Sequence, residues 1–175
     1  MAAKKLPTVG FIGAGRTASV LACSLRDAGY RVVAIASRTR ASAEHLAFIT
    51  KALTRDAQSV ADLADLVFIT TPDDVIGSVA AGVAWRTDLQ VVHTSGALTL
   101  EPLWPAKAAG AHVGSFHPIQ TLLGAGQDSL EGVVFGVEAE GKLRDELWRM
   151  AQRLRGEAID VPGPARALYH AAAVM

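Results

Sequence analysis

The fold is decided by the stretch Thr8-Val-Gly-Phe-Ile-Gly-Ala-Gly-Arg-Thr-Ala18. Its first five residues form an apolar run that predicts a strand, and a G-x-G-x-x-A pattern follows directly. In such a pattern Gly13 allows the tight turn, Gly15 lets a pyrophosphate approach the backbone, and Ala18 lets the next helix pack closely. That helix starts at Arg16 and stops at Gly29, with apolar residues spaced three and four apart. The residues predicted to hold a dinucleotide are Gly13, Ala14, Gly15, Arg16, Thr17 and Ala18, because the amides at a helix start bind phosphate.

The second predicted strand, residues 31–36, is followed by Ser37, Arg38 and Thr39. An NAD site would present Asp or Glu here to hold the ribose 2′-hydroxyl, and this chain has neither. Two hydroxyls and a guanidinium suit a 2′-phosphate instead. The sequence therefore predicts NADP rather than NAD as the cofactor, with an ordinary solvated loop as the alternative.

Strands and helices alternate along the chain, which predicts an α/β fold with a doubly wound, mostly parallel sheet. Further strands are expected at 66–70, 89–93, 111–117, 133–137 and about 158–161, and a short strand and helical turn within 52–64. Further helices are expected at 41–50, 73–81 with Asp73 or Asp74 as the cap, 142–155 and 165–175, and a broken helical stretch between the strands at 89–93 and 111–117. Residues 1–162 form the predicted dinucleotide-binding domain, and residues 163–175 the start of a helical domain. The apolar stripe of the last helix needs a cover, so we expect a fragment of a longer protein or an oligomer.

The composition narrows the possible classes of protein. Half of the residues are hydrophobic and the mean hydropathy is +0.27. Their runs are far shorter than the ~18 residues of a membrane span and fit strands buried on both faces. Seventeen basic and seventeen acidic residues cancel, which argues against a nucleic-acid partner. A single cysteine excludes a disulfide framework within the chain and fits a reducing compartment, and the first residues do not resemble a signal peptide. The sequence therefore predicts a cytoplasmic protein.

Polar residues stand at the expected carboxyl ends of three strands, where parallel sheets bind ligands. Thr70, Thr71 and Pro72 would border the cofactor's ribose side. His93, Ser95 and His117 could converge on the nicotinamide, since hydride transfer needs an acid/base group and histidine titrates near neutrality. For each histidine a structural hydrogen bond at a strand end is the alternative. His112 is expected to be structural and His45 solvated, and no spacing suggests a metal site or a Ser–His–Asp triad.

Several motifs resemble known families. Residues 10–18 resemble the opening of pyrroline-5-carboxylate reductases and their relatives, a superfamily that includes prephenate dehydrogenases. Together, residues 93–97, 114–118 and 169–173 resemble the Rossmann-like proteins that carry a DUF2520 domain. This resemblance implies an NADP-type Rossmann domain joined to a helical C-terminal domain, which completes the substrate pocket and forms a homodimer. In the prephenate branch the corresponding histidine is catalytic and a serine assists it, which points to His117 and Ser95. Arg16 stands where proline-pathway reductases often have Asn, so their substrate is not implied.

The sequence thus predicts an NADP-dependent oxidoreductase domain acting on a small molecule. His117 is the expected acid/base, with Ser95 and His93 in support. Two alternatives stay open: a nucleotide-binding sensor without turnover, and an enzyme that exchanges hydride between NADP and the deazaflavin F420.

Overall fold

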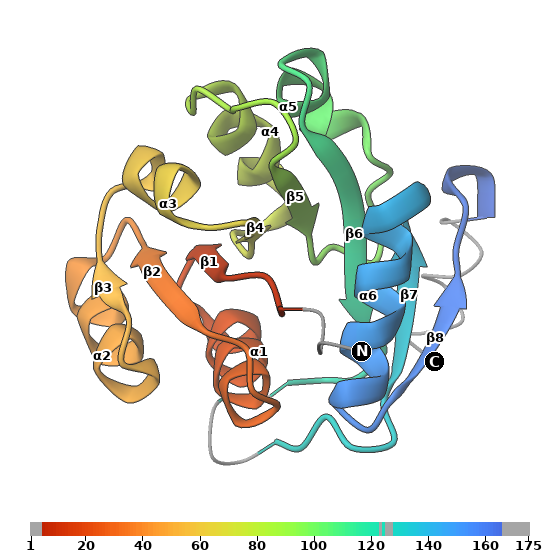
Figure 1. The fold of residues 1–175 in the computed structure, drawn as a ribbon, viewed down its shortest axis with the longest axis horizontal. Helices are drawn as coiled ribbons and strands as arrows, with labels where there is room; N and C mark the ends of the chain where they lie inside the picture. Colours follow the sequence, from red (N-terminus) through yellow and green to blue (C-terminus); the bar gives the residue numbers. More distant parts are fainter. Residues whose placement is uncertain (1–4, 123, 125–127, 166–175) are drawn as a thin grey trace.

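The computed structural model describes residues 5–122, 124 and 128–165. Within these residues eight strands form one sheet in the order β3-β2-β1-β4-β5-β6-β7-β8 (Figure 1). The strands are β1 Val9–Ile12, β2 Val32–Ala36, β3 Leu53–Thr54, β4 Leu66–Ile69, β5 Gln90–His93, β6 His112–Pro118, β7 Val134–Glu138 and β8 Glu157–Asp160. Neighbouring strands run parallel except β6 and β7, which run antiparallel. The predicted α/β fold with a mostly parallel sheet is confirmed.

Helices cover both faces of the sheet, as the alternating pattern predicts. They are α1 Arg16–Asp27, α2 Arg40–Thr50, α3 Ala57–Leu63, α4 Asp73–Ala81, α5 Trp104–Ala108 and α6 Gly141–Arg153, with short 3-10 turns η1 Glu101–Leu103 and η2 Gly163–Ala165. One core cluster joins α1, α2 and α6 to the sheet, and a second joins α3, α4 and α5 to its other face (Figure 1). Strands β1 and β4 are buried throughout, because helices shield both of their sides.

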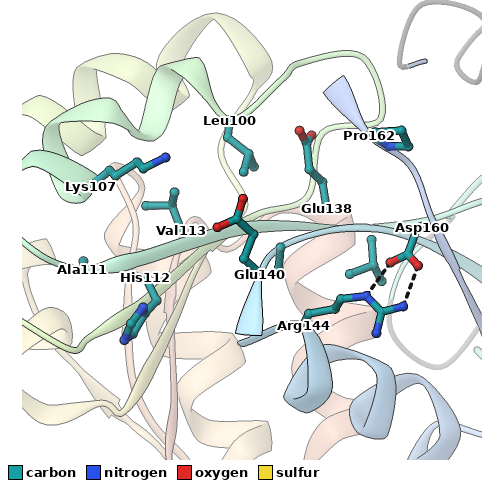
Figure 2. A pocket seen from close by; sticks show the side chains of 12 residues that line it. Leu100, Lys107, Ala111, His112, Val113, Glu138, Glu140, Arg144, Asp160 and Pro162 are labelled. Carbon is teal, nitrogen blue, oxygen red and sulfur yellow. Dashed lines mark hydrogen bonds and ion pairs between the residues drawn. The ribbon is translucent and has the colours of Figure 1, made fainter. Parts of the chain in front are cut away.

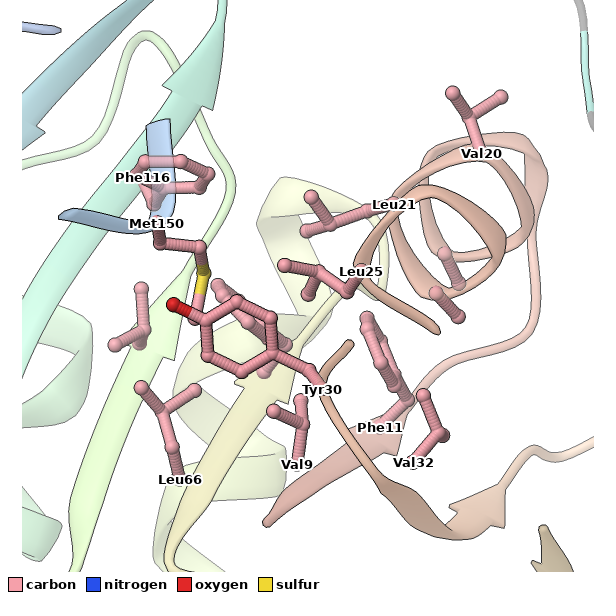
Figure 3. Close-up of a cluster of buried hydrophobic side chains, with 14 of the residues drawn as sticks. Val9, Phe11, Val20, Leu21, Leu25, Tyr30, Val32, Leu66, Phe116 and Met150 are labelled. Carbon is pink, nitrogen blue, oxygen red and sulfur yellow. The ribbon is translucent and has the colours of Figure 1, made fainter. Parts of the chain in front are cut away.

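The core on the α1 side contains a row of phenylalanines that crosses the sheet. Phe11, Phe68, Phe116 and Phe135 lie on β1, β4, β6 and β7, with successive ring centroids 5.4, 6.1 and 4.4 Å apart. Tyr30 packs into the same cluster after α1 (Figure 3). The row therefore ties the first strands of the chain to the later ones.

The last part of the sheet departs from a wholly parallel arrangement. The described residues between β6 and β7 contain no helix, so the chain turns back and β7 pairs antiparallel with β6. Helix α6 then makes a crossover, and β8 pairs parallel with β7. The carboxyl ends of β7 and β8 consequently lie at the opposite edge of the sheet from those of the other strands.

Two element ends differ from the expectation or extend beyond the described residues. Neither Asp73 nor Asp74 caps α4: the N-cap is Pro72, which has ψ +151°, so Asp73 is already the first helical residue. Of the helix expected at 165–175, only Ala165 lies among the described residues, where it is the last residue of η2; residues 166–175 lie outside them.

The strand order reverses between β1 and β4. From β1 the chain proceeds through β2 and β3 on one side, and from β4 through β5 and β6 on the other. Crossover loops on the two sides therefore diverge at the carboxyl ends of β1 and β4, which is where open α/β sheets form a ligand crevice.

Candidate functional site

A tight glycine turn joins β1 to α1 at this reversal point. Gly13 has φ +118°, and a β-carbon there would lie 2.7 Å from the carbonyl carbon and oxygen of Thr70. The Thr70 hydroxyl donates to the Gly13 carbonyl oxygen over 3.1 Å. Only glycine fits at position 13, and Thr70 supports the turn from β4.

Gly15 faces open space. Its φ of −82° suits any residue, yet no atom lies within 4 Å of the position that a β-carbon would take. It is the N-cap of α1, and no side chain caps the helix and no acidic residue stands in the first turn. The first amides of α1 and the positive end of its dipole are therefore suited to an anionic group approaching over Gly15.

A cavity of about 510 Å³ opens on one side of this turn, and we call it the glycine cavity. Thr71 contributes a hydroxyl oxygen that is shielded from solvent and has no hydrogen-bond partner among the described residues. Buried polar atoms are normally paired, so this oxygen suits a ligand that enters the cavity. The lining comprises Ile12, Gly13, Ala14, Gly15, Ala36, Ser37, Arg38, Thr39, Arg55, Asp56, Ala57, Thr70, Thr71, Pro72, Val75 and Val79.

The residues that follow β2, Ser37 to Thr39, line the glycine cavity. Ser37 Oγ accepts a hydrogen bond from the Thr39 amide over 3.3 Å, and the Arg38 side chain is exposed. No carboxylate follows β2, so this end of the cavity offers hydroxyls and a guanidinium.

Two charged residues of the cavity come from the start of α3 and are not indicated by the sequence pattern. Arg55 adds a second guanidinium, and its Nη1 donates to the Thr54 carbonyl oxygen. Asp56 caps α3, accepting from the amide and hydroxyl of Ser59 over 2.8 and 2.9 Å. These hydrogen bonds lower the pKa of Asp56. The carboxylate of Asp56 is therefore engaged in helix capping.

A second cavity, of about 380 Å³, lies on the other side of the turn, and we call it the histidine cavity. Arg16 and Thr17 of α1 line it, so the start of α1 separates the two cavities. Three segments close it: residues 94–96 after β5, residues 117–122 at and after the end of β6, and Asp73 at the start of α4. The lining comprises Arg16, Thr17, Asp73, Thr94, Ser95, Gly96, His117, Pro118, Gln120, Thr121 and Leu122.

The structure brings His117 and Ser95 together in this cavity. Strands β5 and β6 pair parallel with His93 opposite Ser115, so the ends of both strands meet at one edge. The half-buried imidazole of His117 lies on the backbone of Gly96. A β-carbon at position 96 would come within 2.6 Å of Cε1 and 2.8 Å of Nε2 of that ring.

His93 does not line the histidine cavity. Its side chain is fully buried, and the Ser95 amide donates to its Nδ1 over 3.2 Å. Its Nε2 lies 3.1 Å from the Thr99 carbonyl oxygen. Because Nδ1 is the acceptor, the proton of the neutral ring is on Nε2 and is donated to Thr99. His93 thus holds the loop after β5, the alternative that the sequence left open.

The Ser95 hydroxyl is also engaged within the protein. It donates to Oδ2 of Asp73 over 2.7 Å and accepts from the amides of Ala97 and Leu98. Asp73 was not expected to take part in the site, because the sequence suggests only a helix cap. Asp73 on α4 contacts Ser95 in the loop after β5, and the spacing of nearby residues in the sequence does not indicate such a contact.

A third cavity, of about 470 Å³, is lined by residues from the start of β6 and from the carboxyl ends of β7 and β8 (Figure 2). Arg144 at the start of α6 pairs there with Asp160 at the end of β8, over 2.8 and 2.5 Å. His112 also lines it, at the first residue of β6 and 3.5 Å from Asp88. His112 therefore lies away from the glycine turn with its side chain exposed, and His45 is exposed on α2, as expected for a solvated residue.

Among the described residues no group of three or more His, Cys, Asp or Glu side chains could hold a metal ion. None of the described helices is both long and apolar enough to cross a membrane.

The profile of the family described as a Rossmann-like domain matches residues 2–118. No curated protein matches the chain. Among solved structures, a proposed NADP oxidoreductase from Bacteroides fragilis is similar over 97% of this chain and 66% of its own, at 28% identity and a TM-score of 0.86.

Two further structures show how widely the fold is shared. Protein TM1727 from Thermotoga maritima is 25% identical over 95% of this chain and 62% of its own, with a TM-score of 0.75. An imine reductase variant from Myxococcus stipitatus, in complex with NAD+, is 22% identical over 96% of this chain and 60% of its own, also with a TM-score of 0.75. The chain spans less than two thirds of the length of these proteins.

Proposed function

The chain belongs to the family of Rossmann-like domains, and we propose that it is the dinucleotide-binding part of an NADP-dependent oxidoreductase. The observation that carries this proposal is the bare backbone of Gly15 at an uncapped helix start, between two cavities. Pyrophosphate would bind at the α1 amides, and the adenosine would enter the glycine cavity. The nicotinamide end would reach the histidine cavity past Arg16 and Thr17.

The choice of NADP rests on the end of β2. Ser37, Arg38 and Thr39 would hold the 2′-phosphate through charge-assisted hydrogen bonds, and Arg55 lines the same cavity. Asp56 is taken by its cap, so no available carboxylate competes for a ribose 2′-hydroxyl at this end. The Bacteroides relative is described as an NADP oxidoreductase, whereas the Myxococcus enzyme was solved with NAD+.

His117 is the acid/base group of the proposed reaction. The bound cofactor would supply hydride chemistry, and His117 would give a proton to, or take one from, the substrate atom next to the carbon that changes oxidation state. Its place in the histidine cavity, at the end of β6, supports this role. We assign Ser95 and His93 to the loop that supports His117.

We also propose that the chain is related to the DUF2520 proteins. The motifs that resemble DUF2520 proteins support a helical region after residue 162 that completes the substrate pocket and joins two copies. The residues that select the substrate would lie in that helical region. We also expect the protein to be located in the cytoplasm.

The binding step is tested by titrating the protein with NADPH. Gly15→Ala places a methyl group where the pyrophosphate must approach, so the Kd should rise by about tenfold or more, a loss of about 1.4 kcal/mol. Its free energy of unfolding should change by less than about 1 kcal/mol, because only the N-cap preference changes. Gly77→Ala in α4, where a β-carbon meets nothing closer than 3.9 Å, is the matched control and should bind normally. Unchanged NADPH binding by Gly15→Ala would contradict the proposal.

The catalytic step is tested on the full-length protein with a panel of carbonyl and imine substrates and with reduced F420. Replacing His117 by Ala should lower turnover by about 10²- to 10⁴-fold and leave the Kd for NADPH unchanged. NADPH binding without turnover of any substrate would favour a sensor, and hydride exchange with F420 alone would favour the deazaflavin enzyme.

A further inference from the structure

The loop of residues 94–99, which we call the platform loop, is fixed by hydrogen bonds on two sides. On the β5 side, buried His93 bridges the amide of Ser95 and the carbonyl of Thr99. Within the loop, the Ser95 hydroxyl oxygen accepts from the amides of Ala97 and Leu98 over 3.2 and 3.0 Å. The Ser95 side chain is therefore the centre of the loop's own structure.

Asp73 fixes this centre from a different element. Its Oδ2 accepts the Ser95 hydroxyl proton over 2.7 Å, although 22 residues separate the two in the chain. A serine hydroxyl has one proton to donate, and this geometry directs it to Asp73. The bond thus ties the platform loop to the start of α4, whose first residue is Asp73.

The platform loop meets His117 at Gly96. The imidazole lies so close to the Gly96 α-carbon that a β-carbon would collide with three ring atoms, at 2.6 to 2.9 Å. Residues Ser95 and Gly96 are adjacent, so a displacement of Ser95 moves the surface on which the ring lies.

We propose that Asp73 is a positioning residue for His117: it holds the Ser95 hydroxyl, which sets the place of Gly96 and thereby the orientation of the imidazole. The role given to His117 in turnover rests on the proposed function, but the way in which the ring is held does not.

The first test uses the NMR signals of the histidine rings and needs neither cofactor nor substrate. Replacing Asp73 by Ala should shift and broaden the imidazole signals of His117, while those of exposed His45 and His112 stay in place. Asp73→Asn keeps an oxygen that accepts from Ser95 and removes the charge, so it should restore the His117 signals. Asp74→Ala removes a carboxylate from the same helical turn without touching Ser95 or the cavity, and should have no effect.

The second test measures turnover once a substrate is found. A displaced acid/base group costs rate rather than cofactor binding, so Asp73→Ala and Ser95→Ala should each lower kcat by about 10- to 100-fold. The Kd for NADPH should stay unchanged. Because Ser95→Ala already removes the hydrogen bond that Asp73→Ala breaks, the double variant should be no slower than the slower single variant.

Three results would overturn the proposal: unchanged His117 signals in Asp73→Ala, an Asp73→Asn variant that behaves like Asp73→Ala, or additive losses in the double variant. Failure of the proposed function looks different. In that case His117→Ala would leave turnover intact, while the ring signals would still respond to Asp73.

Discussion

Arg38, after β2, and Arg55, between β3 and α3, line the glycine cavity from two separate loops. Arg38 has no hydrogen bond within the described residues, whereas Arg55 donates to the Thr54 carbonyl. Replacing Arg38 by Ala should therefore weaken NADPH binding by about 10- to 100-fold, the value of a charge-assisted hydrogen bond. Arg55→Ala should weaken it less. Calorimetric titration with NADPH and with NADH measures both Kd values, and NADH binding should not change.

Lys51→Ala, which removes an exposed charge at the end of α2, is the control for the overall loss of positive charge. If wild-type protein binds NADH as tightly as NADPH, the preference assigned to these arginines is wrong.

At the same scale, the sequence locates Gly13, Gly15 and the Ser37–Thr39 segment, because each belongs to one local motif. It misses Arg55 and Asp73. These residues reach the cavities only through packing between elements, which short-range spacing does not encode.

Asp65 joins the starts of β1 and β4. Burial alone would raise the pKa of Asp65, but the amide and hydroxyl of Thr8 both donate to it over 2.8 Å and lower that pKa overall. A lowered pKa stabilises the folded state above the unfolded value of about 4. That stability is lost as the pH falls through the folded pKa. Asp65→Asn should therefore make the free energy of unfolding fall less steeply between about pH 5 and pH 3. The difference from wild type should be less than about 1 kcal/mol, because Asp65 is exposed. Melting temperatures measured over this pH range check the prediction.

Asp62→Asn is a suitable comparison, since Asp62 is an exposed aspartate of neighbouring α3 whose one hydrogen-bond donor within the described part of the chain is Gln58. If Asp65→Asn and wild-type protein lose stability in parallel over this pH range, Asp65 does not contribute in this way.

Element types follow well from the sequence, and element ends less well. The strands at 66–70 and 89–93 are short runs rich in Leu, Val and Ile, and their predicted ends agree with the structure to within one residue. The cap of α4 is wrongly predicted because Asp is a common capping residue, yet Pro72 takes that position. Asp73 thereby enters the first turn, from which its carboxylate reaches Ser95.

At the scale of the whole molecule, a buried hydrogen bond links the segment after α1 to α6. The Tyr30 hydroxyl, after α1, donates to Oε1 of Glu146 on α6 over 3.2 Å. Burial and then the adjacent carboxylate raise the pKa of Tyr30. Tyr30→Phe should lower the free energy of unfolding by about 1.5–3 kcal/mol, because a buried bond to a charged group is lost. Urea denaturation measures this.

Glu146 also forms an ion pair with half-buried Arg149, so a Tyr30→Phe/Glu146→Leu double variant should not recover the loss, because Arg149 would be left without its partner. A Tyr30→Phe variant within about 0.5 kcal/mol of wild type would show that the bond is neutral.

The sequence predicts the mostly parallel sheet but not the direction of β7. Strand direction depends on how the chain returns between residues 119 and 133, and that segment carries no periodic pattern. The reversal is therefore a property of the tertiary structure alone.

The start of β6 lies at the opposite edge of the sheet from His117, and this distant edge suits chemical attachment. His112 lies five residues before His117 on β6, about 16 Å away at the usual rise of a strand. A dye or surface linker placed at position 112 would leave the glycine and histidine cavities accessible. Ligand binding could then be followed on the immobilised protein.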